Sequence, residues 1–134
     1  MPYNNNFYFD KVDVSNQDQI KLFFSKLFRK HSRLDVVINN AGGLIERKLV
    51  EDISIELFDN VINLNSRSAL LITSEAVKQM RKSGKGGSII NVSSIAARHG
   101  GAAGSVLYAS SKGFISTMTR GFAKELVKDN IRVN

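Results

Sequence analysis

The 134-residue chain has no cysteine, so it can form neither a disulfide framework nor a thiolate metal site. Its two histidines, His31 and His99, lie far apart and show no metal-ligand spacing. Every apolar run is short and broken by Asn or Ser, which excludes a membrane-spanning segment. The first ten residues show neither the basic region nor the apolar run of a secretory signal, and we expect a cytoplasmic location.

Acidic residues are also scarce, because 12 Asp and Glu stand against 19 Lys and Arg, and the net charge is +7. This balance raises nucleic-acid binding as a hypothesis. However, the basic residues are scattered over segments such as 21–33 and 78–85, where they fit the solvated faces of amphipathic helices. No aromatic platform accompanies them. We expect no nucleic-acid or membrane partner, and a basic surface would suit an anionic cofactor or substrate.

The order of predicted elements is typical of an α/β domain with a parallel sheet. Alternating or apolar runs predict strands at 7–14, 34–40, 88–94 and 131–134. The run at 34–40 is apolar enough for a strand covered on both faces. Apolar residues at helical spacing predict helices after N-caps at Ser15 (with Asp18) and Ser54, and longer helices over about 65–81 and 105–128. The glycines at 84–87 are expected to end one helix, and 96–104 is expected to be a flexible loop.

The unusual residues gather where this fold places ligands. In open parallel sheets, ligands bind beyond the carboxyl ends of the strands. The stretch NNAGG at 39–43 follows one predicted strand, and a serine pair with a glycine-rich loop follows the next. Tyr108 and Lys112 open the following helix, one turn apart on the same face. Such a pair is either a solvated surface pair or an activated proton donor, since an ammonium lowers the pKa of a phenol.

Taken together, these stretches resemble the short-chain dehydrogenase/reductase family. The matching pieces are NNAG at 39–42, Asn65, NVSS at 91–94 and YASSK at 108–112, in the family's order and at about its spacing. The pair Asp13–Val14 and the closing IRVN also fit, so the resemblance covers nearly the whole chain. Residues 104–126 are similar to 3-oxoacyl-carrier-protein reductases and to sugar or alcohol dehydrogenases.

The resemblance implies a Rossmann-type doubly wound parallel sheet, of which this chain holds strands 3, 4, 5 and the start of 6 with the intervening helices. It implies NAD or NADP as cofactor, and hydride transfer between nicotinamide and an alcohol or carbonyl substrate. Tyr108 would donate or accept the proton, and Lys112 would tune Tyr108. Ser94 would hydrogen-bond the substrate oxygen, and Asn65 would anchor a water leading to Lys112. Ser93 is interpreted as structural.

The resemblance also places residues against the cofactor. Asn40, Ala41 and Gly42 would lie against its ribose, where Tyr108 and Lys112 also contact it. Asp13 and Val14 would touch the adenine.

The simpler interpretation of each polar residue is structural. Ser94 can be a turn residue, Asn65 a helix cap and Asp13 a solvated strand end.

Two parts of the family pattern are missing from the 134 residues. No G-x-x-x-G-x-G phosphate loop is present, and the loop that would bind substrate beyond IRVN is absent. We therefore expect one incomplete NAD(P)-binding domain over 1–134, with residues 1–6 disordered. With strands 1 and 2 absent, a gap of roughly 14 Å would separate strand 3 from strand 4.

The chain could then act as a dehydrogenase or be an inactive fragment or a non-catalytic binding module of that fold. By resemblance, it would form homo-oligomers through the helices near 65–81 and 105–128.

Overall fold

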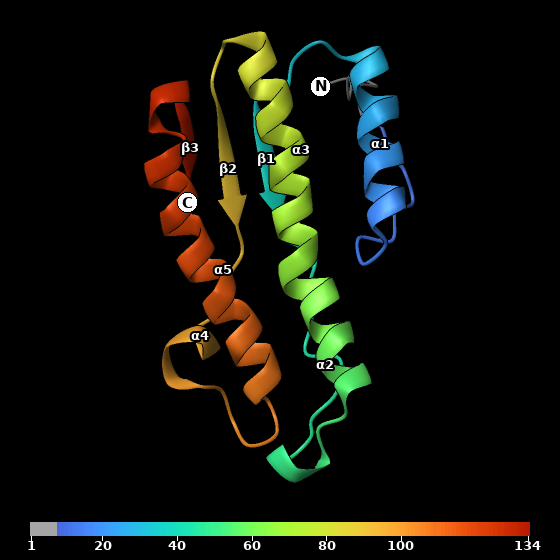
Figure 1. Ribbon diagram of the computed structural model, residues 1–134, viewed down its shortest axis with the longest axis vertical. Helices are drawn as coiled ribbons and strands as arrows, with labels where there is room; N and C mark the ends of the chain where they lie inside the picture. The colour runs from blue at the N-terminus through green and yellow to red at the C-terminus, as the bar shows by residue number, and fades with distance from the viewer. Residues whose placement is uncertain (1–7) are drawn as a thin grey trace, which may run out of the picture.

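The computed structural model describes residues 8–134, and a parallel three-stranded sheet lies at its centre (Figure 1). The predicted α/β class is confirmed. The strands lie in chain order, with Val37 opposite Ile89 and Asn39 opposite Asn91. All carboxyl ends therefore meet at one edge. The strands are β1 (Val36–Asn39), β2 (Gly87–Asn91) and β3 (Ile131–Val133).

Two long helices pack against one face of this sheet, and a third helix lies beside them (Figure 1). They are α3 (Ser68–Ser83), α5 (Val106–Glu125) and, beside α3, α1 (Gln17–Lys30). The shorter helical segments are η1 (Val50–Asp52), α2 (Ile55–Ile62), η2 (Asn63–Arg67), α4 (Ala96–His99) and η3 (Val127–Asp129).

The hydrophobic core lies between the sheet and these helices. Ile89 of β2 is fully buried at its centre, and the next strand adds Ile131 and Val133. A second cluster joins α1 to α3, where Ile20 and Phe24 pack against Ala76. Burial of one such large side chain contributes about 1.5–3 kcal/mol. These apolar stripes are the ones that the sequence periodicity predicts.

The start of α1 differs from the prediction by one residue. Asn16, not Ser15, is the N-cap, because its side-chain oxygen accepts from the N–H groups of Asp18 and Gln19. Ser15 instead donates its N–H and its hydroxyl to the carboxylate of Asp13. Both residue types are good caps, so the sequence pattern alone could not decide between them.

The predicted strand at 7–14 is wrong over its described part. Residues 8–14 contain no strand, and residue 7 lies outside the described residues, as do the residues 1–6 that were expected to be disordered. A strand needs a neighbouring strand to receive its backbone hydrogen bonds, and β1 pairs only with β2. Alternating aromatic residues therefore do not suffice to form one here.

One face of the sheet is exposed, which corrects the expectation that 34–40 forms a strand covered on both faces. Val36 and Ile38 are 52% and 61% exposed, and Ile90 of the neighbouring strand is also exposed. These residues point to the face opposite α3 and α5, because side chains alternate along a strand. Among residues 8–134, nothing covers this face.

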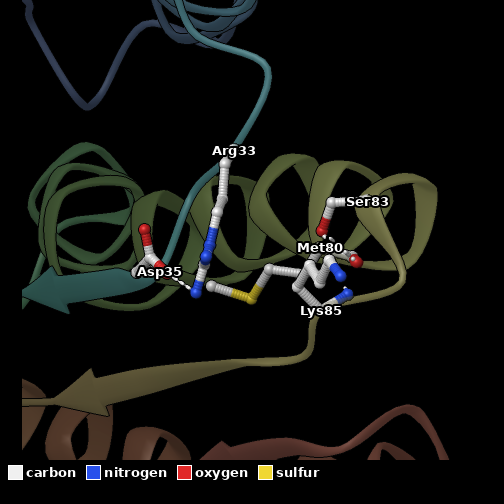
Figure 2. Close-up of polar contacts among 5 residues, drawn as sticks. All are labelled: Arg33, Asp35, Met80, Ser83 and Lys85. Carbon is white, nitrogen blue, oxygen red and sulfur yellow. Dashed lines mark hydrogen bonds and ion pairs between the residues drawn. The ribbon is translucent and has the colours of Figure 1, made fainter.

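Two groups of local contacts lie at the amino end of the sheet (Figure 2). Arg33 and Asp35 form an ion pair just before β1. At the end of α3, Ser83 Oγ donates to the Met80 carbonyl at 2.9 Å, and the N–H of Lys85 donates to Ser83 Oγ at 3.4 Å. Gly84 then ends the helix in a left-handed conformation, as predicted from its sequence.

No helix within residues 8–134 is long and apolar enough to cross a membrane. The same part of the chain contains no group of three or more side chains that could hold a metal ion.

Candidate active site

A buried network of side chains ties the carboxyl ends of β1 and β2 to the long helices. Asn39 Nδ2 donates to Asn91 Oδ1 at 2.8 Å and to Thr73 Oγ1 of α3 at 3.0 Å. Asn91 Nδ2 donates to Thr119 Oγ1 of α5 at 2.9 Å. Each asparagine closes an apolar strand, so its amide is buried and needs these partners. The network fixes the strand ends relative to both helices.

Lys112 of α5 is attached to the segment that follows β2 by two hydrogen bonds. Its Nζ donates to the Val92 carbonyl at 2.7 Å, and its own carbonyl accepts from Ser93 Oγ at 3.0 Å. Ser93 Oγ also lies 2.7 Å from Ser116 Oγ. The interpretation of Ser93 as a structural residue agrees with these contacts. Together they hold one turn of α5 against the end of the strand.

The ammonium of Lys112 lies in a buried position beside Tyr108. Lys112 is 4% exposed, and its Nζ is 6.0 Å from the centre of the Tyr108 ring. Burial lowers the pKa of Lys112, because the charged form loses solvation. The solvated surface pair that the sequence left open is therefore wrong for Lys112, whereas Tyr108 is half-buried.

Asn65 lies in a wide turn that the sequence did not predict. The segment η2 is a π-helical turn that joins α2 directly to α3, so the predicted helix start near residue 65 is wrong. Asn65 is 1% exposed, and it is not a helix cap. Its side chain accepts from the Gly43 N–H at 2.8 Å and donates to the Gly43 carbonyl at 2.9 Å. Such π-turns are frequent at functional sites.

The side chains of Asn65 and Lys112 both lie close to the backbone of Gly42. A Cβ atom at residue 42 would lie 2.6 Å from Asn65 Oδ1 and 3.2 Å from Lys112 Nζ. Only glycine allows the backbone to approach both groups this closely. Gly42, Asn65 and Lys112 therefore form one polar cluster at the carboxyl edge of the sheet, contributed by three separate elements.

Ser94 also lies at the carboxyl edge of the sheet, but its hydrogen-bond partner is not a member of this polar cluster. Its Oγ accepts from the Ala96 N–H at 3.2 Å. Ala96 begins α4, so part of the loop predicted to be flexible is helical. Within residues 8–134, no hydrogen bond joins Ser94 to Tyr108. Ser94 is two residues beyond Val92, whose carbonyl accepts a hydrogen bond from the Lys112 ammonium.

A separate cavity of about 430 Å³ lies between α1 and β1. Val14, Asn40 and Ala41, three of the predicted cofactor-binding residues, line this cavity. Most of its other lining is apolar, with Phe23, Phe24, Leu27, Ile38 and Ile72 among the residues.

This cavity and the polar cluster do not share residues. Ser94, Tyr108 and Lys112 do not line the cavity, and neither does Asp13. The Asp13 carboxylate is occupied by Ser15, whose hydrogen bonds lower the pKa of Asp13. The structure thus divides the predicted cofactor-binding residues into separate groups.

Sequence reasoning missed the part played by Gly43. Its backbone N–H and carbonyl hold Asn65, whereas the resemblance named only the three residues before it. The signal available in the sequence is the second glycine of NNAGG.

The sequence matches the profile of a known protein family. The sequence profile described as short chain dehydrogenase matches residues 3–134. The chain belongs to the short chain dehydrogenase family. The family predicted from NNAG, NVSS and YASSK is thus confirmed.

Two curated relatives show how far the similarity of this short chain dehydrogenase extends. It is 41% identical over 127 residues to the 3-oxoacyl-[acyl-carrier-protein] reductase FabG of Thermotoga maritima, covering 92% of this chain and 49% of that protein. It is 37% identical over 126 residues to the uncharacterized oxidoreductase YgfF of Escherichia coli, covering 92% of this chain and 51% of that one. The chain spans about half the length of the curated relatives it matches.

A solved relative carries the expected kind of cofactor. The NADH-dependent reductase A1-R' complexed with NAD has a TM-score of 0.88 and 37% identity, covering 92% of this chain and 53% of that chain. The predicted fold and the predicted nicotinamide cofactor are therefore confirmed for the family.

Proposed function

We propose that this protein is an NAD- or NADP-dependent oxidoreductase that transfers a hydride between nicotinamide and an alcohol or carbonyl substrate. The observation that supports this proposal most directly is the polar cluster. The buried ammonium of Lys112 lies one helical turn from the Tyr108 ring, and Asn65 and Gly42 lie beside it. Buried titratable groups held by several partners are typical of catalytic sites.

Tyr108 is the proton donor or acceptor in this proposal. Hydride transfer changes the charge on the substrate oxygen, so a proton must move with it. An ordinary phenol is a poor base at neutral pH. The Lys112 ammonium lies 6.0 Å from the centre of the Tyr108 ring, so a positive charge stands beside the proposed proton-transfer group. Bound nicotinamide would supply the hydride or accept it.

Ser94 and Asn65 complete the proposed machinery. Ser94 would donate its hydroxyl to the substrate oxygen, since its Oγ already accepts from Ala96 and keeps its own O–H. Asn65 would hold a water that leads to Lys112, because its amide and the Lys112 ammonium both lie beside Gly42.

The cofactor would lie along the carboxyl edge of the sheet. Asn40, Ala41 and Gly42 would contact the ribose, because Gly42 lies beside the Lys112 ammonium. Tyr108 and Lys112 would hold the ribose from the other side. Val14 would contact the adenine, because it shares a cavity with Asn40 and Ala41.

Asp13 would contact the adenine as well. Its carboxylate would do so from its exposed position next to Val14, keeping its hydrogen bonds from Ser15.

Association into a homo-oligomer is proposed through α3 and α5. Leu70 and Phe114 are 38% and 46% exposed on these helices, whereas Val77 and Ile115 are buried in the core. Exposed apolar residues on two long helices are typical of a surface that packs on another copy.

A non-catalytic binding module is the second candidate. The cavity between α1 and β1 favours it, because this mostly apolar space contains none of Ser94, Tyr108 and Lys112.

The test is hydride transfer followed by nicotinamide absorbance. The chain is assayed alone and fused to the part of the Thermotoga maritima reductase that has no counterpart in it. Oxidation of a secondary alcohol that is lost in Tyr108→Phe supports the enzyme. Dinucleotide binding without turnover in either polypeptide supports the binding module instead.

A further inference from the structure

Ile45 has a backbone conformation that a β-branched residue rarely adopts. Its φ is 63°, and within residues 8–134 the other non-glycine residue with positive φ is Asn130. Asparagine tolerates this region, whereas isoleucine is a genuine outlier there. The Glu46 N–H donates to the Leu44 carbonyl at 2.8 Å, so Ile45 is the centre of a γ-turn of the rare, strained hand.

The strained turn is held at both ends. Before it, Asn65 binds the N–H and the carbonyl of Gly43. After it, the Lys48 N–H donates to the Gly104 carbonyl at 3.0 Å, and Arg47 Nη1 donates to the Ala103 carbonyl at 3.2 Å. Such flanking contacts are what allows a strained residue to persist. The segment 43–48 thus connects Asn65 to the loop that leads into Tyr108.

The backbone of this turn does not require isoleucine. Glycine or asparagine would adopt a positive φ at lower cost. Packing within the chain is also a weak reason for the residue, because the Ile45 side chain is 52% exposed while core isoleucines such as Ile89 are fully buried. Neither the backbone nor the packing of this chain therefore accounts for a branched apolar side chain at this position.

The position of the turn indicates a role for the Ile45 side chain in substrate binding. Residues 40–48 follow the carboxyl end of β1, the edge at which open α/β sheets bind ligands. Ile45 is two residues beyond Gly43, which is bonded to Asn65 of the polar cluster. A half-exposed apolar side chain here can contact the carbon skeleton of a substrate whose oxygen faces Tyr108.

We propose that Ile45 is a specificity residue that contacts the apolar part of the substrate and favours secondary alcohols or ketones with a bulky apolar ring or branch. This inference rests on the proposed function. It deepens that function by naming the substrate class that the site selects.

The first test is a contact measurement that needs no turnover. The chain carries isotope-labelled isoleucine methyl groups, and it is titrated with cyclohexanol and with 2-propanol, each with and without NAD. The Ile45 methyl signal, assigned with Ile45→Val, should shift with cyclohexanol and several-fold less with 2-propanol. Ile55, which is 77% exposed on α2, is the control. Equal shifts at Ile45 and Ile55 would overturn the proposal.

The second test separates strain from selectivity. Leu49→Asn is the matched control for Ile45→Asn, because Leu49 is 54% exposed on the same segment with a φ of −68°. Ile45→Asn should have a melting temperature several degrees above that of Leu49→Asn, because asparagine relieves the strain. In the active fusion, Ile45→Asn should lower the ratio of kcat/KM for cyclohexanol to that for 2-propanol by about 10-fold, and Leu49→Asn should not.

The outcomes distinguish this inference from the function on which it rests. A fusion that transfers hydride with an unchanged ratio in Ile45→Asn overturns the specificity role alone. A fusion without any turnover contradicts the proposed function, and the methyl titration then decides whether Ile45 contacts the alcohol.

Discussion

The ammonium nitrogen of Lys112 donates to the carbonyl oxygen of Val92 at 2.7 Å. This bond joins the first turns of α5 to the chain just beyond β2. It therefore fixes the position of the helix that carries Tyr108 relative to the end of that strand. It also provides a partner for a charge that is 4% exposed. A lysine with such a bond has a defined position but loses much of its solvation, which lowers its pKa.

The burial of Lys112 predicts a particular pH dependence of stability. Between the lowered pKa of the folded state and the ordinary value of 10.5, the unfolded chain binds more protons than the folded chain. The free energy of unfolding contributed by Lys112 therefore rises with pH in this window. Urea unfolding should show the unmodified protein gaining stability relative to Lys112→Met as pH rises toward 10.5. Parallel curves for the two proteins would contradict this.

Tyr108→Phe should abolish most turnover without affecting the fold. The substitution removes only the hydroxyl, whereas general acid–base catalysis usually contributes about 10²–10⁴-fold in rate. We expect single-turnover hydride transfer in the active fusion to fall by at least that factor, with an unchanged melting temperature. Tyr8→Phe is the control, because Tyr8 is 74% exposed. A rate within a few-fold of the unmodified protein would mean that Tyr108 is not the proton donor.

Gly42→Ala should destabilise the protein far more than Gly43→Ala. A Cβ at residue 42 would collide with Asn65 Oδ1 and approach Lys112 Nζ, whereas a Cβ at residue 43 meets nothing within 4 Å. Displacing Asn65 breaks its bonds to Gly43, and we expect a loss of about 1–3 kcal/mol. Chemical unfolding of the two variants measures the difference. Equal losses would show that the close approach at Gly42 has no energetic consequence.

Asn39 and Asn91 should be energetically coupled. Each single change to alanine removes one partner of the 2.8 Å bond and leaves the other amide buried. We expect each to cost about 1–3 kcal/mol, and the double variant to cost less than the sum. A double-mutant cycle of unfolding free energies gives the coupling. Additive losses would indicate that the bond between the two amides contributes nothing of its own.

Charges on the exposed faces of α3 and α5 should prevent association. Leu70→Glu and Phe114→Glu place a carboxylate where an apolar contact between copies is proposed. We expect the unmodified protein to sediment as an oligomer at tens of micromolar, and both variants to sediment as smaller species. Val50→Glu changes a residue that is 79% exposed in η1 and should behave like the unmodified protein. A monomeric unmodified protein would refute the proposed interface.

Local signals predicted much of the fold because they act between residues close in the chain. The apolar row that includes Ile20 and Phe24 gave the helix over 17–30, and Ser54 caps α2 as predicted. The β-branched run at 36–38 gave β1. Each of these depends on spacing or capping within a few residues. The sheet edge that holds NNAGG and YASSK followed from the alternation of such elements.

Other features depend on partners far away in the sequence. Residues 8–14 have the alternation of a strand but no neighbouring strand to pair with, and Val36 and Ile38 have the composition of buried residues but nothing that covers them. Asn65 lies in a π-turn, and its amide binds Gly43, which is 22 residues earlier in the chain. No local pattern contains these contacts.

The sequence alone determined which residue types are available for proton transfer and on which edge of the sheet they lie, because motif order and hydrophobic period are local properties. Only the tertiary structure decided that Lys112 is buried against Val92 and that Gly42 leaves room for Asn65 and Lys112. It also revealed the positive φ of Ile45. Burial, close approach and backbone strain arise when distant segments compete for the same space, so they exist only after the chain has folded.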